Sequence, residues 1–453
     1  MKADDLVDIT SLTASEILAA IGDGRTTAEE VVGGCLARIR ADEERVQAWA
    51  FIDETRALEQ ARNVDRVRRE GHAAGPLHGL PVGIKDIIDT ADMPTEDGTV
   101  LLAGRRPDFD ATVVERLRSA GAIILGKTVT TELATYAPGK TRNPVDPAHT
   151  PGGSSSGSAA AVAAHMVPVA IGTQTNGSVI RPAAFCGVYG YKPTFGLVPR
   201  HGILEQSRPL DTVGFFARTV EDLAIIAEPL MGYDERDPDT RPAARPALRE
   251  VAMQEPPLPP TFAFTKTPNW DDADDETRLA FDEVAQALGE RVFPFSVPAL
   301  FADAWRWHAT IMEADIARSF HELHERGSER LSASLRGQIE RGGRVTAVDY
   351  NNAVARMRAT NAAFDELFDR CDALLTAAAP GPAPRGLEST GSPDFSTLWT
   401  YTGMPAVTLP LLRADNGLPM GIQLIGRRGD DARLLRTARW LAGWASDQER
   451  DVS

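Results

Sequence analysis

Two one-sided apolar patterns open the chain, and each follows a Thr that has a Glu three residues after it. This spacing is the capping box, in which the two side chains satisfy backbone N–H groups at the start of a helix. The two pairs are Thr13 with Glu16 and Thr27 with Glu30. We therefore expect amphipathic helices over 13–21 and 27–39, then a strand over 48–52 and a charged helix over 54–70.

Short apolar runs between turn-forming residues recur along the rest of the chain. Runs of this length and setting are typical of buried strands. They cover residues 80–85, 122–127, 167–171, 262–265, 373–376, 406–409 and 421–425. Residues 112–120 show helical spacing between the first two runs, with Thr112 as the expected N-cap. Because strands and helices alternate with short connections, the pattern predicts an α/β sheet.

Residues 236–260 are rich in Pro and interrupt this alternation, which predicts a surface connection and not a linker between independent domains. After it, two long amphipathic helices are expected over 300–323 and 346–368. They could cover the sheet or overhang a site on it. We predict a single domain over 1–453. Its parts are an N-terminal helical arm (1–75), a catalytic core (76–235 and 370–453), and the connection with a cap-like helical insertion (236–369).

Charge and cysteine content limit the class of protein. The 453 residues carry 48 basic and 64 acidic side chains, a net charge of −16. This acidic balance disfavours nucleic acid and anionic membranes as partners. The sequence has no leader of a basic and then an apolar segment, and no apolar run of about 20 residues. Cys35, Cys186 and Cys371 stand far apart among apolar residues, so we expect reduced thiols and a cytoplasmic protein.

The densest cluster of Gly, Ser and Thr lies in residues 150–192. A run of serines that begins at Ser154 leads into an Ala-rich helical segment, whose first N–H groups favour negative charge. After a short strand, the loop GTQTNGS ends in Ser178. The N–H groups of Asn176 and Gly177 can turn inward there, as an oxyanion hole for acyl transfer requires. Plain turns are the alternative, so a nucleophilic Ser178 beside Ser154 is a hypothesis at this point.

Lys85 closes the apolar run 80–85, where a charged side chain is costly unless it is paired or neutral. A neutral buried lysine can accept a proton. The alternative is a surface lysine whose ammonium reaches water beyond an apolar stem. A buried Lys85 would give a serine nucleophile a base without any histidine.

Two other motifs suggest different chemistry. GSSSG at 153–157 fits G-x-S-x-G, which would make Ser155 the nucleophile of an α/β-hydrolase elbow. That elbow must follow a strand directly, whereas RNPVDPAHTPG precedes this one. His321 and His324 are one residue too close for the zinc motif H-E-x-x-H, because residue 325 is Glu. Since no nucleotide-binding glycine loop occurs either, we expect no metal and no organic cofactor.

Three motifs in order carry a family resemblance: Lys85 in GIKD, Ser154 in the Gly-Gly-Ser loop, and Ser178 in GSVIRPAAFCG. With their serine separation (178 − 154 = 24), they resemble the amidase signature family of Ser-Ser-Lys amide hydrolases over nearly the whole chain. The resemblance implies an α/β fold with a large mixed β-sheet flanked by helices on both faces.

The family's catalytic roles fall on matching residues of this chain. The resemblance implies Ser178 as nucleophile, Ser154 as the bridging serine after a cis Gly153–Ser154 peptide, and Lys85 as the base. It also implies an oxyanion hole made by the N–H groups of Thr175, Asn176, Gly177 and Ser178. The chain departs from the commonest family pattern at three positions, which lie outside the triad. They are Ser156 for Gly, Gln174 for Asp and Asn176 for Gly.

The motifs GGSSSGS, TQTNGSVIRPAA, STGSP and LWT look most like the malonamidase branch, which hydrolyses amides of small dicarboxylic acids. This resemblance implies that Arg181 binds the free carboxylate of the substrate. Because Arg181 precedes Pro182, we expect an extended backbone at Arg181. The alternative is a structural arginine paired with Asp86 or Asp211.

We expect an amide hydrolase for small, carboxylate-bearing amides of the malonamate type, acting as a homodimer. One alternative is the catalytic subunit of an amidotransferase-type complex; another is an amidase for small urea-derived, aryl or alkyl amides. The acidic charge and the lack of an added module favour a free-standing enzyme. A non-enzymatic descendant is disfavoured because Lys85, Ser154 and Ser178 are all present.

Overall fold

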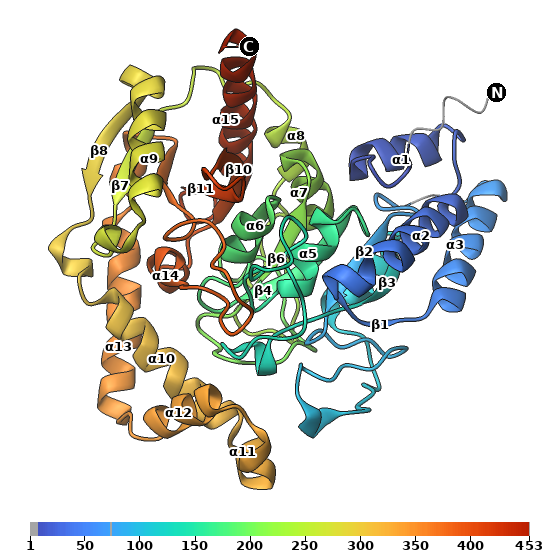
Figure 1. Cartoon of the computed structure of the whole chain (residues 1–453), viewed down its shortest axis with the longest axis horizontal. Helices are drawn as coiled ribbons and strands as arrows, with labels where there is room; N and C mark the ends of the chain where they lie inside the picture. The colour runs from blue at the N-terminus through green and yellow to red at the C-terminus, as the bar shows by residue number, and fades with distance from the viewer. Residues whose placement is uncertain (1–7, 73–74, 453) are drawn as a thin grey trace.

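The computed structural model describes residues 8–72 and 75–452, and within them eleven strands form one mixed sheet (Figure 1). The strands are β1 (Trp49–Ile52), β2 (Pro81–Lys85), β3 (Ile123–Thr128), β4 (Val169–Gln174), β5 (Tyr189–Lys192), β6 (Thr212–Ala217), β7 (Phe262–Lys266), β8 (Val292–Ser296), β9 (Ala373–Ala377), β10 (Ala406–Arg413) and β11 (Pro419–Ile425). Every strand expected from the sequence is present, and β5, β6 and β8 are additional.

The order of strands across the sheet is β1-β3-β2-β4-β6-β5-β10-β11-β9-β7-β8. Strand β2 runs parallel to both β3 and β4, and β7 runs parallel to both β8 and β9. The other neighbours are antiparallel. Strands β7 and β8 come from the segment 236–369, yet they pair within the same sheet as the strands of the predicted core.

Helices cover both faces of the sheet. Helix α6 (Ile180–Cys186) packs closely against β5. A Cβ atom at Gly190 of β5 would lie only 2.6 Å from the Cβ atom of Ala183 in α6. Neighbouring residues of a strand point to opposite faces. The hydroxyl of Tyr191 donates a 2.6 Å hydrogen bond to Asp431, the first residue of α15 (Asp431–Val452). Helices α6 and α15 therefore lie on opposite faces, which confirms the predicted layered α/β arrangement.

The N-terminal arm consists of α1 (Ala14–Gly22), α2 (Ala28–Val46) and α3 (Glu54–Arg69). Both predicted capping boxes are present at the starts of α1 and α2. The prediction that Thr112 caps the next helix is wrong, because Thr112 is already the first residue of α4 (Thr112–Ser119). Its hydroxyl instead donates a hydrogen bond to Asp234.

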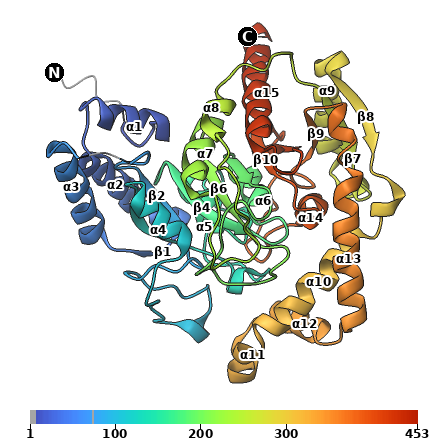
Figure 2. The same cartoon turned by 180° about the vertical axis from the view of Figure 1, so that it is seen from behind.

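Helices α10 (Ala304–Ser319), α11 (His321–Gly327), α12 (Ala333–Gly342) and α13 (Ala347–Ala363) gather beside one end of the sheet, below α14 in Figures 1 and 2. The prediction of one continuous helix over 300–323 is wrong, since the chain leaves helical geometry at the buried Phe320. The sequence HELHER that follows has a single apolar residue, so it lacks the stripe that packs α10.

The remaining helices complete the layers. They are α5 (Ser156–Ala163), α7 (Val220–Ala227), α8 (Leu248–Ala252), α9 (Asp275–Leu288) and α14 (Asp394–Tyr401), with 3-10 turns η1 (Val100–Leu102), η2 (Glu132–Ala134), η3 (Glu228–Leu230), η4 (Trp270–Asp272), η5 (Gly289–Arg291), η6 (Ala299–Phe301), η7 (Ser328–Arg330) and η8 (Leu367–Asp369). Among the helices of the described residues, none combines the length and the apolar character needed to cross a bilayer.

Candidate active site

The structure brings Lys85 and Ser154 into direct contact. Lys85 is the last residue of β2, and β4, the parallel neighbour of β2, ends at Gln174. Because the carboxyl ends of parallel strands meet at one edge of a sheet, the loops after β2 and β4 lie together. The Lys85 Nζ donates hydrogen bonds of 2.7 Å to Ser154 Oγ and 2.9 Å to Thr173 Oγ1.

Because Lys85 is buried, its ammonium group can lose its proton near neutral pH. Its side chain has no exposed surface, and burial lowers its pKa to about 7, against the opposing effect of the Asp211 charge. Two more lysines, Lys127 and Lys192, are fully buried, but neither donates a hydrogen bond to a serine within the described chain. The alternative of a surface Lys85 is therefore wrong.

Ser178 lies beside the serine loop. The Ser155 N–H donates a 3.4 Å hydrogen bond to the Ser178 carbonyl, and the Gly153–Ser154 peptide is cis, as the resemblance implied. The Ser178 hydroxyl has no hydrogen-bond partner among residues 8–72 and 75–452, and Ser178 is 8% exposed. No hydrogen bond joins the Ser154 and Ser178 hydroxyls in the described structure. Catalytic contacts of this kind often tighten only when substrate binds.

The loop between β4 and α6 offers free donors. The backbone N–H groups of Asn176, Gly177 and Ser178 reach no acceptor within the described residues. Gln174 fixes the end of this loop, because its Oε1 accepts hydrogen bonds from the N–H groups of Val179 (2.8 Å) and Ile180 (3.0 Å) at the start of α6. Free N–H groups on a rigid loop are what an oxyanion hole requires.

Asn176 is held by side chains on both sides. Its Nδ2 donates a 3.1 Å hydrogen bond to the Tyr136 hydroxyl, and its Oδ1 accepts one of 2.7 Å from Thr397. The Thr400 hydroxyl donates a 2.5 Å hydrogen bond to the Asn176 carbonyl. The two departures from the commonest family pattern at 174 and 176 therefore both supply contacts that fix the loop.

Arg181 is a buried cation beside the serine loop. It is 1% exposed, and its Nη2 donates hydrogen bonds of 2.7 Å to the Gly153 carbonyl and 3.2 Å to Thr390 Oγ1. Its Nε and Nη1 are buried and have no partner in the described part of the chain. Burial lowers the pKa of Arg181 to about 10, so the side chain is still charged at neutral pH.

Two expectations for Arg181 are wrong. Arg181 is the second residue of α6 and is therefore helical. Pro182 after it does not prevent the helix, because a proline in the first turn lacks only an N–H that would have no intrahelical partner there. Arg181 also pairs with neither of the proposed acids. Asp86 Oδ1 instead lies 3.9 Å from Lys127 Nζ, and the Asp211 carboxylate accepts a hydrogen bond from the Thr175 hydroxyl.

The competing motifs do not form sites. The Ser155 hydroxyl donates to the Thr173 carbonyl (3.1 Å) and accepts from the Thr173 N–H (3.2 Å), and no strand directly precedes it. His321 lies 3.4 Å from Glu325, and His324 contacts Ser328. No group of three or more metal-ligating side chains occurs in the residues that the structure describes.

Several contact residues were not assigned to the site from the sequence, and three of them contact Lys85 or Thr175. Thr173 accepts from Lys85, while Asp211 and His308 both contact Thr175. Thr173 could have been found, because it lies on the strand that leads directly into the loop 175–178. The other two are distant in sequence, and no motif marks them.

A model of the amidase family matches residues 30–435 of the chain. The chain belongs to the amidase signature family. Peptide amidase from Stenotrophomonas maltophilia, a solved structure, is 29% identical with a TM-score of 0.83, and the match covers 96% of this chain and 97% of that one. This amidase is therefore an enzyme of the amide hydrolase class with the fold expected from its motifs.

Two further likenesses involve proteins described as parts of complexes. A glutamyl-tRNA(Gln) amidotransferase subunit from Chloroflexus aggregans is 35% identical over 95% of this chain and 96% of the relative. A chain from a solved vestigial protein complex, described as revealing the evolutionary origins of an s-triazine catabolic enzyme, is 27% identical with a TM-score of 0.89, and the match covers 96% of this chain and 98% of that one. These names favour the alternative of an amidotransferase component over malonamate specificity.

Proposed function

We propose that this amidase hydrolyses small amides through an acyl-enzyme on Ser178. Ser178 Oγ attacks the carbonyl carbon while its proton passes through the Ser154 hydroxyl to neutral Lys85. The N–H groups of residues 175–178 donate to the developing oxyanion. The proton then returns to the leaving nitrogen as the C–N bond breaks. Water hydrolyses the Ser178 ester, which releases the acid and restores the serine.

The observation that carries this proposal is the contact between Lys85 and Ser154. A lysine with a pKa of about 7 is about half neutral at pH 7, and its Nζ lies 2.7 Å from the Ser154 hydroxyl. No acid is paired with Lys85 within the described residues, so its neutral form is not opposed by an ion pair. This combination supplies a base without histidine.

A carboxylate on the substrate would suit Arg181. Its two unpartnered nitrogens are buried, and a buried charge without hydrogen bonds is costly unless a ligand supplies them. Each of these two nitrogens carries an N–H that can donate a charge-assisted hydrogen bond to a carboxylate oxygen. Arg181 also donates to the Gly153 carbonyl, next to the proposed bridging serine, so a carboxylate held there would lie close to the reacting bond.

A second candidate is the same chemistry within an amidotransferase-type complex. The relatives named as components of glutamyl-tRNA(Gln) amidotransferase support it, and so does the likeness to a chain from a solved protein complex. In that case the chain would release the amide nitrogen for transfer within the complex. Both candidates share the proposed triad and a substrate that carries an amide and a carboxylate.

Ammonia release by the purified chain tests the substrate class and the need for a partner. Malonamate and acetoacetamide form a matched pair, because they have similar size and differ in the carboxylate. Glutamine and asparagine extend the carboxylate-bearing set. We expect turnover of at least one carboxylate-bearing amide and weaker turnover of acetoacetamide.

The same preparation separates the two candidates. A free-standing enzyme is active alone and elutes as the predicted homodimer. A component of a complex is inactive or weakly active alone and gains activity when a partner co-purifies from its own cells. Turnover of acetoacetamide as fast as malonamate would contradict the carboxylate proposal.

A further inference from the structure

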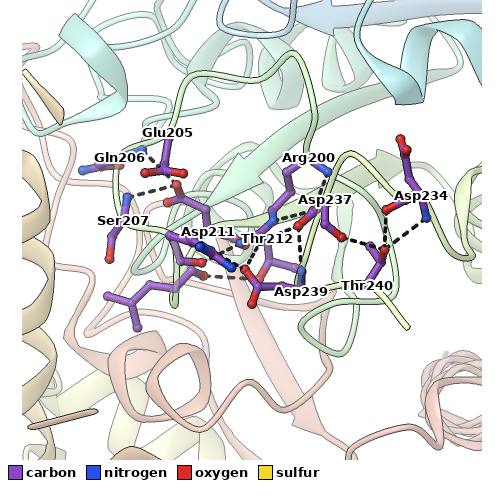
Figure 3. Close-up of polar contacts among 12 residues, drawn as sticks. Arg200, Glu205, Gln206, Ser207, Asp211, Thr212, Asp234, Asp237, Asp239 and Thr240 are labelled. Atoms are coloured by element: carbon purple, nitrogen blue, oxygen red, sulfur yellow. Dashed lines mark hydrogen bonds and ion pairs between the residues drawn. The ribbon is translucent and has the colours of Figure 1, made fainter. Parts of the chain in front are cut away.

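Thr175, in the loop that ends at Ser178, is tied to the carboxylate of Asp211. The Thr175 hydroxyl donates a 2.6 Å hydrogen bond to Asp211 Oδ1. The other oxygen, Oδ2, accepts from the backbone N–H groups of Gln206 (2.8 Å) and Ser207 (2.9 Å) (Figure 3). One carboxylate therefore joins the loop that follows β4 to the loop that precedes β6.

The Asp211 carboxylate forms no ion pair among the described residues, although Arg200 lies beside it. Arg200 Nη1 donates a 3.1 Å hydrogen bond to the backbone carbonyl of Asp211, not to its carboxylate. The Arg200 guanidinium instead pairs with Asp237 (2.9 Å) and Asp239 (2.6 Å), as Figure 3 shows. No ion pair to Asp211 occurs among the described residues. Its carboxylate is left for Thr175 and two N–H groups.

The charge of Asp211 also acts on Lys85. It is the opposite charge that raises the pKa of Lys85, whereas burial lowers that pKa. Burial raises the pKa of Asp211 itself to about 6, so its carboxylate is mainly ionised at pH 7. The charged groups around it are Lys85 on β2, Arg200 with Asp237 and Asp239, and Asp315 on α10.

Helix α10 supports the same loop from the other side. His308 Nε2 donates a 2.9 Å hydrogen bond to the Thr175 carbonyl. Two turns later on α10, Asp315 accepts a 2.7 Å hydrogen bond from the Ser207 hydroxyl, and the Ser207 N–H donates to Asp211. Thr175 is thus fixed through both its hydroxyl and its carbonyl.

We infer that Asp211 is a positioning residue for amide hydrolysis, which holds the oxyanion loop in place through its hydrogen bond with Thr175. The inference rests on the proposed function, because it assigns the loop 175–178 and Lys85 their roles. Among the described residues, the Asp211 carboxylate has no hydrogen bond to Lys85, Ser154 or Ser178. It lines a cavity of about 270 Å³ together with Thr173 and Thr175, on the side of the loop where Arg200 lies.

The inference predicts two separable effects of Asp211→Asn. Loss of the fixed Thr175 contact lowers kcat roughly 10- to 100-fold with little change in KM, because misplacing a transition-state group costs rate. Loss of the negative charge lowers the pKa of Lys85, so the ascending limb of kcat/KM moves to lower pH. A residue that only stabilises the fold would not move that limb.

Three variants isolate the effects. Thr175→Val removes the hydroxyl and keeps the carboxylate, so kcat falls while the pH limb moves less than in Asp211→Asn, because the lost hydrogen bond only raises the pKa of Asp211. Thr175→Ser keeps the hydroxyl and restores kcat. Glu205→Gln is the matched control, since it removes a carboxylate from the loop that precedes β6, where Glu205 pairs with Arg318 and has no contact with residues 175–178 or Arg200, and it leaves both quantities unchanged.

The outcomes separate this inference from the proposed function. Activity retained by Ser178→Ala or Lys85→Met overturns the proposed function itself. If those variants are inactive while Asp211→Asn has wild-type kcat and an unshifted limb, only the role of Asp211 is overturned. If Asp211→Asn does not fold, the comparison of Thr175→Val with Thr175→Ser tests the inference instead. A wild-type kcat for Thr175→Val then overturns it.

Discussion

Arg181 gives the sharpest test of the substrate class, because only part of its bonding capacity is used within the protein. Its Nη2 donates to Gly153 and Thr390, while Nε and Nη1 have no partner among the described residues. We expect Arg181→Met to remove both functions: the support of the serine loop and the binding of a substrate carboxylate. The two losses differ in one respect, since only the second depends on the substrate.

The magnitude follows from the two free nitrogens. Hydrogen bonds to charged groups contribute about 1.5–3 kcal/mol, so losing the carboxylate contact lowers kcat/KM for malonamate roughly 10- to 150-fold. Loss of the Gly153 contact affects malonamate and the neutral acetoacetamide equally. The ratio of their kcat/KM values therefore isolates the carboxylate contact, and we expect it to fall by that factor.

Steady-state ammonia release for both substrates measures this ratio, and Thr390→Val is the control. That variant removes one hydroxyl partner of Arg181 and keeps its charge, so the ratio should stay near the wild-type value. An equal loss for the two substrates in Arg181→Met would refute the reasoning. Arg181 would then only support the Gly153–Ser154 loop.

Three further results are expected. The kcat/KM of the wild type rises with pH through about 7, because the base is neutral Lys85 with a pKa of about 7; a plateau already reached by about pH 6 would indicate a carboxylate base. Burial lowers the pKa of His308 from 6.5 to about 4 in the folded protein, so the unfolded state binds more protons between these values. The free energy of unfolding should therefore fall by roughly 3 kcal/mol as pH drops from 6.5 to 4, and chemical denaturation should show a smaller fall for His308→Gln. A chelator should leave activity unchanged, and loss restored by added zinc would contradict a metal-free mechanism.

Local signals predicted the elements that position the site. The capping boxes at Thr13 and Thr27 mark helix starts through contacts three residues apart, and both are present. The apolar run that ends at Lys85 predicted β2, and the run 167–171 predicted β4, which continues to Gln174 through three residues that were expected in the loop. That β2 and β4 are parallel neighbours, which brings Lys85 near the serine loops, is seen only in the structure.

Contacts between distant segments could not be predicted in the same way. Thr175 meets Asp211 and His308, which lie 36 and 133 residues away, and neither pair leaves a periodic pattern in the sequence. The extended backbone expected at Arg181 failed for a local reason. Gln174 accepts two N–H groups at the start of α6, so the helix begins there and Pro182 falls within its first turn.

The site of covalent labelling tests the central claim, that Ser178 is the nucleophile. A fluorophosphonate reacts with an activated serine hydroxyl, and peptide mapping by mass spectrometry identifies the modified residue. We predict modification at Ser178 in the wild type and in the matched control Ser155→Ala, and no modification in Ser178→Ala. Modification at Ser155, or full amide hydrolysis by Ser178→Ala, would contradict the account.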